Sequence, residues 1–276
     1  MPGRPLKGAA ARGGAMSNQN QVEMERGPVL RRSEHWVLMK AARAAAQLRA
    51  QTAVLMLSRH GIRFFAADDP TSPAWWVDVA VRDPAAAPGR AVIARPAELA
   101  AALWATWWRG RGGARIIPGP GAAQFEARGR VAEIRGHIVD FGPGAGVPIS
   151  EGEELEVGDY YPVAVAEVPS TLAADVAAAA ARYAAVELLL TNDDQWQLEV
   201  TGDNWIRRTP VKMLMLPPYH TVVGWYRAMI LAELFSITKL ADLTLEFTEP
   251  LELPALRAHW DAARRVRVEA FVAPLG

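Results

Sequence analysis

Apolar and polar residues follow two periods along the chain, and the two periods alternate in a fixed order. Four segments place apolar residues three or four positions apart, which is typical of helices with one buried face. The expected helices are residues 31–48, 96–107, 171–183 and 228–237. Between them lie short runs that are rich in apolar, β-branched and aromatic residues, and these runs predict strands.

After each expected helix come two strands that form a hairpin, and these are followed by at least one further strand. In chain order they are residues 53–57, 62–66, 75–81, 91–94, 114–117, 123–127, 131–140, 161–168, 186–191, 196–200, 206–214, 221–225, 243–247, 251–253 and 265–272. This unit occurs four times, which predicts an architecture built from repeats, with each helix packed on a sheet. Strands that come in hairpins favour antiparallel sheets, so the predicted class is α+β.

A glycine- and proline-rich stretch after Asp140 separates two similar halves of the chain. Glycine and proline at this density interrupt both helix and sheet, and an aperiodic stretch of this length is typical of a linker or a functional loop. The sequence therefore predicts a mostly disordered tail over residues 1–30, a first domain over 31–140, a connector over 141–159 and a second domain over 160–276.

Composition narrows the classes of function. The 276 residues are 51% hydrophobic, which is enough for a large core, and the formal net charge of +0 excludes a strong overall attraction to nucleic acid. There is no cysteine, so thiolate chemistry and disulfides are excluded. No apolar run approaches the roughly twenty residues that span a bilayer, so no membrane partner is expected.

Candidate catalytic chemistry is sparse. The five histidines do not pair at metal-ligand spacing, and there is no nucleophile elbow, Walker loop or dinucleotide fingerprint. The acidic pairs at 68–69 and 193–194 are interpreted as turn residues rather than metal ligands. The sequence therefore predicts no catalytic residues, no metal and no cofactor, and a protein that is not an enzyme.

Several segments, taken in order, resemble the sliding clamps of the proliferating-cell nuclear antigen (PCNA) family, above all the archaeal members. They are 57–64 with 67–70, 138–140 with 146–148, 201–203, 226–231, 238–242, 249–251 and 271–274. The resemblance spans most of residues 36–276. It implies a trimeric ring of two-domain subunits, with sheets outside and helices lining a channel for duplex DNA. It also implies a polymerase processivity factor that tethers polymerase, clamp loader, ligase and nuclease through short motif peptides.

The resemblance assigns sequence-independent DNA contacts to cations on or near the expected helices. These are Lys40, Arg43, Arg109, Arg111 and Arg182. The helix faces are less basic than the family pattern, since Glu98, Asp175 and Glu233 occupy polar positions, so an ordinary solvated face remains open for Lys40 and Arg43. The connector and the loop 68–73 are also longer than the pattern.

The resemblance further implies a partner-peptide pocket on the outside of the ring. Its expected residues are Trp75, Gly146, Val147, Pro148, Pro250, Phe271, Ala273 and Pro274. Because neighbouring strand residues face opposite sides, Phe271 and Ala273 are assigned to the pocket and Val272 to the core. As a wall of that pocket, Val147 changed to Asp would weaken peptide binding by at least ~2 kcal/mol.

Ring closure needs unpaired edge strands, which are expected within 131–138 and 205–214. The trimer is either homomeric or built from paralogues. Two other hypotheses stay open: a clamp-like checkpoint or interaction ring without a replicative DNA role, and a small-molecule enzyme on an unrecognised α+β fold. The expected location is the cytoplasm of an archaeal cell at the nucleoid, or the nucleus if the source is eukaryotic.

Overall fold

The computed structural model describes most of the two predicted halves and part of the connector. The described residues are 29–58, 60–69, 71–82, 89–107, 114–119, 122–127, 130–140, 147–150, 153–155, 161–218, 220–237, 241–249 and 254–275. Most of the expected N-terminal tail and the expected strand at 251–253 lie outside these residues. Val29 and Leu30, at the end of the expected tail, form a short strand, β1 (Val29–Leu30), in which Leu30 is fully buried.

All four predicted helices are present. They are α2 (Arg32–Gln47), α3 (Pro96–Trp107), α4 (Leu172–Ala180) and α5 (Ala228–Phe235). Residues at the N-termini of α2 and α3 favour the start of these two helices. The carboxylate of Glu34 accepts the backbone N–H of Arg31 at 2.7 Å, which satisfies a donor that the helix leaves unpaired. Pro96 occupies the first position of α3, where its missing N–H costs nothing.

The remaining strands are mostly those that the alternation predicts. They are β2 (Thr52–Ser58), β3 (Gly61–Ala67), β4 (Trp75–Arg82), β5 (Arg90–Ala94), β6 (Ala114–Gly119), β7 (Ala122–Ala127), β8 (Arg130–Arg135), β9 (His137–Asp140), β10 (Val147–Ser150), β11 (Glu153–Leu155), β12 (Pro162–Val168), β13 (Ala185–Asn192), β14 (Trp196–Gly202), β15 (Trp205–Pro210), β16 (Lys212–Met215), β17 (Thr221–Arg227), β18 (Leu243–Thr248), β19 (Leu256–Ala263) and β20 (Val266–Val272). Every pair of strands is antiparallel, which confirms the α+β class.

The repeats interlock in pairs. In each unit a first strand precedes a helix and a three-stranded meander, and that first strand pairs with the meander of the neighbouring unit. The four such pairings are β1 with β6, β5 with β2, β12 with β18 and β17 with β13. Each unit thus completes the sheet of its neighbour, so a single unit leaves an incomplete sheet.

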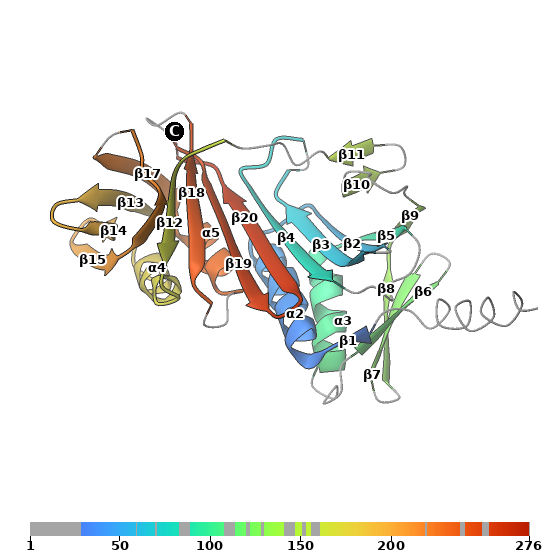
Figure 1. The fold of residues 1–276 in the computed structure, drawn as a ribbon. Coiled ribbons are helices and arrows are strands. Elements are labelled where there is room, and N and C mark those ends of the chain that lie inside the picture. The colour runs from blue at the N-terminus through green and yellow to red at the C-terminus, as the bar shows by residue number, and fades with distance from the viewer. Residues whose placement is uncertain are drawn as a thin grey trace, which may run out of the picture.

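One sheet of ten strands runs through both halves, in the order β16-β12-β18-β19-β20-β4-β3-β2-β5-β9. The halves join where β20 pairs with β4 over seven residue pairs, from Val266↔Val81 to Val272↔Trp75. Figure 1 shows the smaller sheets β15-β14-β13-β17 and β1-β6-β7-β8 at opposite ends of the molecule.

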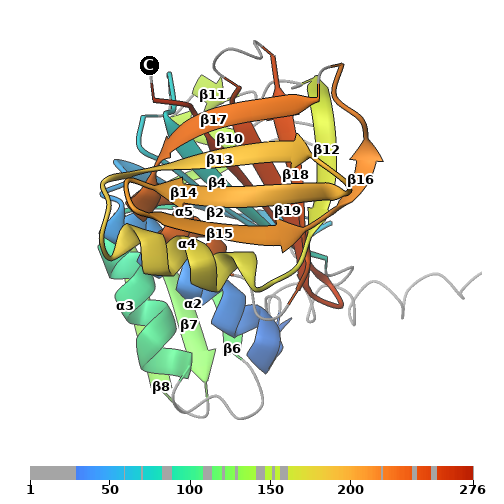
Figure 2. The same ribbon diagram turned by 90° about the vertical axis from the view of Figure 1, so that its left-hand side faces the viewer.

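The helices lie together on one side of the sheets (Figures 1 and 2). Alternate strand residues pack beneath them in the main core, as Leu55, Phe64, Trp75 and Val268 do. We call the opposite face of the ten-stranded sheet the outer face. A second, smaller core lies there, which gives the central strands buried residues on both sides.

Besides β1, the structure departs from the predicted strands in four places. The strand β19 was not predicted although its residues alternate, because its outward residues are all polar and its inward ones include alanine. Two predicted long strands are each broken in two, β8–β9 at Gly136 and β15–β16 at Val211. A Cβ at Gly136 would lie 2.4 Å from the carbonyl oxygen of Ile93, so only glycine allows the bend. The connector, expected without strands, forms the hairpin β10–β11.

Candidate interaction surfaces

The helix side carries the two cations that the sequence singled out on α2. Lys40 is half-buried with its Nζ 5.6 Å from the centre of the Trp36 ring, and Arg43 is exposed. Both line a cavity of about 220 Å³ between α2 and α5, together with Gln47, Glu233 and Ser236. Burial raises the pKa of the Glu233 carboxyl, while the charges of Arg43 and Lys40 lower it in part. The α2 cations therefore face a carboxylate, which reduces their attraction for phosphate.

The other helices offer few cations on their exposed faces. Arg182, beyond the end of α4, is exposed, whereas Arg109 and Arg111 lie outside the described residues. The exposed residues of α3 and α5 include Trp104, 43% exposed, and Met229, 63% exposed. Phosphate contact by Lys40, Arg43 and Arg182 therefore stays a prediction.

The two expected edge strands are edges in the structure. Strand β8 ends the sheet β1-β6-β7-β8, and β15 ends the sheet β15-β14-β13-β17. Each carries an exposed aliphatic residue, Val131 at 58% and Ile206 at 54%. An open edge with exposed apolar residues is a surface that readily pairs with another chain. Because the two strands lie at opposite ends of the molecule (Figure 1), they suit head-to-tail contacts.

An apolar cluster covers part of the outer face. We call it the outer apolar cluster: Val54, Met56, Phe65, Ala67, Trp76, Ala91, Val147 and Phe271. All eight residues are at most 6% exposed, and Val147 of the connector is at 0%. The Trp76 ring stacks between Phe65 and Phe271, with ring centres 6.2 and 5.9 Å away. Two of the predicted pocket residues, Val147 and Phe271, thus meet in one place.

The assignment of Trp75 to the outer pocket is wrong. Trp75 packs in the main core beneath the helices, and its neighbour Trp76 lies in the outer apolar cluster. The reason is strand alternation, which also places Val272 in the main core and Phe271 outside, as the sequence predicted. Applied to β4, the same argument would have selected Trp76.

The other predicted pocket residues are placed only in part. Ala273 packs against the outer apolar cluster, and its N–H donates to the carbonyl oxygen of Ala74 at 2.8 Å. Pro274 follows in the same segment and is half-buried. Pro148 belongs to β10, while Gly146 and Pro250 lie outside the described residues. That these residues form a partner pocket stays a prediction.

A set of charged residues and one histidine lies beside the cluster on the outer face. We call it the outer charged network: Arg63, Asp78, Glu246, Arg257, His259, Arg267 and Glu269. It crosses the junction of the halves, since Arg63 and Asp78 come from β3 and β4 and the rest from β18 to β20. Arg63 donates to both oxygens of Asp78, from Nε to Oδ1 and Oδ2 at 2.9 Å each and from Nη2 to Oδ2 at 2.6 Å. Burial would raise the pKa of Glu269, but its bonds to Arg257 and Arg267 outweigh it and leave that pKa lowered.

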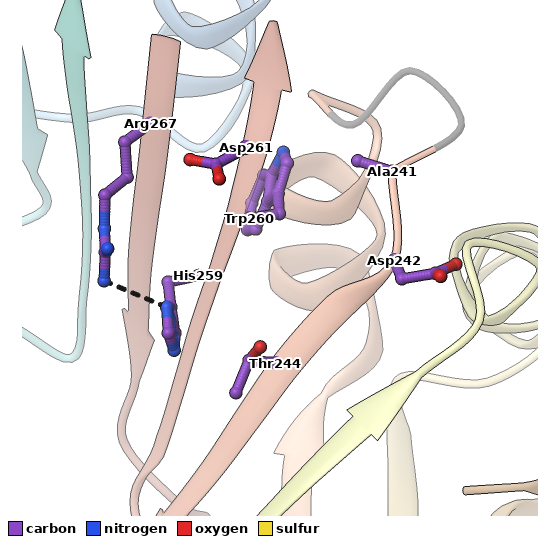
Figure 3. A pocket seen from close by; sticks show the side chains of 7 residues that line it. All are labelled: Ala241, Asp242, Thr244, His259, Trp260, Asp261 and Arg267. Carbon is purple, nitrogen blue, oxygen red and sulfur yellow. Dashed lines mark hydrogen bonds between the residues drawn. The ribbon is translucent and has the colours of Figure 1, made fainter. Parts of the chain in front are cut away.

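One end of the network lines a pocket of about 290 Å³ (Figure 3). Asp242, Thr244, His259, Asp261 and Arg267 contribute polar groups there. Arg267 Nη2 lies 3.0 Å from His259 Nδ1, and burial, together with this guanidinium, lowers the pKa of His259. The imidazole is therefore neutral at pH 7. Within the described residues no group of three or more histidines and carboxylates could hold a metal ion.

Comparison with known proteins identifies the fold. No family model matches the sequence, and no curated protein matches it significantly. The structure is similar to a chain of a solved structure described as "C-terminal region of FEN-1 bound to A. fulgidus PCNA", with a TM-score of 0.64 and 12% sequence identity. The match covers 90% of this chain and 97% of that chain. In the part of the chain that the structure describes, no helix is long and apolar enough to cross a membrane.

The fold is thus of the PCNA type, mostly antiparallel sheets with four helices in the described residues. Sequence reasoning missed three features of the candidate surfaces. They are the outward residues of β2 and β3 in the outer apolar cluster, the charges of β19, and the seating of Val147. Alternation carried a signal for the first two. Nothing in the sequence indicates where a valine in a connector will pack.

Proposed function

We propose that this chain is a subunit of a ring that encircles duplex DNA and tethers replication and repair enzymes. The observation that carries the proposal is the pair of open edges, β8 and β15, at opposite ends of a PCNA-type fold, each with an exposed aliphatic residue. The match spans nearly all of the neighbour's chain, so we take that chain to be the PCNA of the complex. In this proposal the protein has no catalytic activity and binds polymerase, clamp loader, ligase and nuclease through short motif peptides.

Assembly is tested by size-exclusion chromatography with light scattering, on the chain alone and mixed with sister subunits from the same organism. A trimer is expected, and Val131→Asp or Ile206→Asp should weaken it because each puts a charge into an apolar edge contact. Met229→Asp is the matched control, since Met229 is as exposed but lies on α5. A proline at Ile134 would also weaken the β8 edge, because it removes a backbone donor, but Ile134 is only 1% exposed and its loss would disturb the core as well. Val131 is therefore the better test. A monomer under all these conditions would contradict the ring.

DNA contact is tested separately. Contacts to phosphate alone give weak binding that falls with salt, with a log–log slope of about −0.9 for each phosphate neutralised. Lys40→Glu combined with Arg43→Glu should reduce stimulation of a polymerase without unfolding the protein. Sequence-specific binding would rule out a clamp.

A second candidate is a clamp-like ring subunit of the checkpoint or interaction type, without a direct replicative DNA role. The specific observation in its favour is the helix side, where Glu233 faces Lys40 and Arg43 and where Trp104 and Met229 are exposed. Ring assembly without stimulation of a polymerase by the wild-type protein would favour this candidate. Unchanged stimulation by the Lys40 and Arg43 variants would instead make these residues an ordinary solvated face.

A further inference from the structure

The connector does not run freely between the two halves of the chain. Its strands β10 and β11 pair from Val147↔Leu155 to Ser150↔Glu153, with an irregularity between Pro148 and Ser150. Strand β10 contacts β2 and β5, the same strands that supply Val54, Met56 and Ala91 to the outer apolar cluster. Figure 1 shows this hairpin beside the end of the sheet that holds β2, β5 and β9, away from the helices.

Val147 is seated in the cluster as completely as the residues of the sheet. Its side chain is at 0% exposure, whereas a valine that merely bordered an open groove would keep one side in water. The neighbours in the cluster are aliphatic and aromatic, with the stack Phe65–Trp76–Phe271 at its centre. This is the chemistry that accepts aliphatic and aromatic anchors of a bound peptide.

We propose that the hairpin β10–β11 is a resident occupant of the outer apolar cluster and that a partner peptide binds by displacing Val147. The inference rests on the proposed function, since it takes the cluster to be the partner site. It differs from a site in which Val147 is a fixed wall. A wall adds to binding, whereas an occupant competes with it.

Only molecules in which the hairpin has left the cluster can bind the peptide. The apparent affinity is therefore the intrinsic affinity multiplied by the fraction of such molecules. Unseating the hairpin by substitution should therefore strengthen peptide binding. Val147→Asp places a carboxylate, which is costly to bury, at the position of Val147 in the cluster. We expect roughly tenfold tighter peptide binding. This is opposite in sign to the expectation for a wall. Tyr161→Asp is the matched control, because it adds the same charge just past the connector at a residue that is 79% exposed.

The absence of cysteine gives a direct measurement of displacement. Val147→Cys introduces the only thiol of the chain, and its alkylation rate reports how often the hairpin leaves the cluster. The probe is a synthetic peptide with a glutamine, an aliphatic residue and two adjacent aromatic residues, titrated by calorimetry and then added at saturation. If the peptide displaces the hairpin, alkylation becomes faster. If Val147 is a wall, the peptide covers the thiol and alkylation becomes slower.

The outcomes separate the inference from the proposed function. Faster alkylation with peptide, together with tighter binding to Val147→Asp than to Tyr161→Asp, supports the displacement. Slower or unchanged alkylation overturns it, even if the protein forms a ring. No binding of the peptide to wild type or to Val147→Asp at millimolar concentration also overturns it. Ring assembly, measured by light scattering on the same samples, decides the proposed function independently of the thiol.

Discussion

On strand β4, Trp76 and Asp78 point to the same outer face of the sheet, yet they belong to regions that are stabilised in different ways. The outer apolar cluster excludes water and is covered by a segment of the connector. The outer charged network leaves several side chains partly exposed and pairs them across strands, as Arg257 does with Glu246 and Glu269. A sheet face away from the core can thus be stabilised by a cover or by charge pairing, and the choice changes within two residues of one strand.

The stability of the two regions should therefore respond to different kinds of substitution. The cluster depends on volume and shape, because each lost atom leaves a cavity in a closed space. The network depends on the pairing of charges, and its exposed members contribute little, since water and salt screen them.

The largest expected effect is in the cluster. Trp76→Ala removes the ring between Phe65 and Phe271 and should lower the free energy of unfolding by about 4 kcal/mol, measured by chemical denaturation. Trp225→Ala is the control, because Trp225 is 45% exposed and its removal should cost less than about 1 kcal/mol. Equal losses would show that the cluster is not closed.

The next effect is a loss of stability at acid pH that is expected from His35, which is buried between α2 and α3 and not in either outer region. Burial lowers the pKa of His35 to about 4, although its bond to the carbonyl oxygen of Leu103 raises it in part. The unfolded chain therefore takes up the proton first as the pH falls through 6.5. Stability that is complete above pH 6.5 should be lost toward pH 4, by about 3 kcal/mol. Denaturation at a series of pH values measures it, and His35→Gln should flatten the curve.

The charged network is tested at its most buried carboxylate, that of Asp78. Asp78→Asn leaves the guanidinium of Arg63 without its carboxylate and should cost about 2 kcal/mol of unfolding free energy. Replacing both partners, as Arg63→Met with Asp78→Leu, should cost less than Asp78→Asn alone, because no charge is then left unpaired. A double variant that is less stable than the single one would contradict this account.

The smallest effect is expected at the far edge of the same sheet. Lys212 Nζ lies 3.0 Å from Glu167 Oε2, but the two side chains are 74% and 40% exposed. Lys212→Ala should therefore change the unfolding free energy by less than about 0.5 kcal/mol in thermal or chemical denaturation. A loss comparable to that of Asp78→Asn would mean that exposure does not govern the strength of ion pairs on this sheet.

Much of the fold was predictable because its signals are local. The helical period gave all four helices and the alternation gave most strands, since each depends on neighbours within a few residues. The recurrence of the unit gave the repeats, and the alternation placed Phe271 and Val272 on opposite faces. The edges β8 and β15 were also expected, because closing a ring needs an unpaired edge strand in each domain.

What the sequence by itself determined about this protein is therefore the order of its elements and the face on which most strand residues lie. Only the tertiary structure decided which strands pair across the two halves, that Glu233 faces Lys40 and Arg43, and that Val147 is seated between strands far from it in sequence. These depend on contacts between segments separated by up to two hundred residues, and a local pattern carries no information on such distances. A connector rich in glycine and proline specifies a turn in the chain. Which apolar surface it then covers depends on where the folded sheet leaves apolar side chains exposed to water.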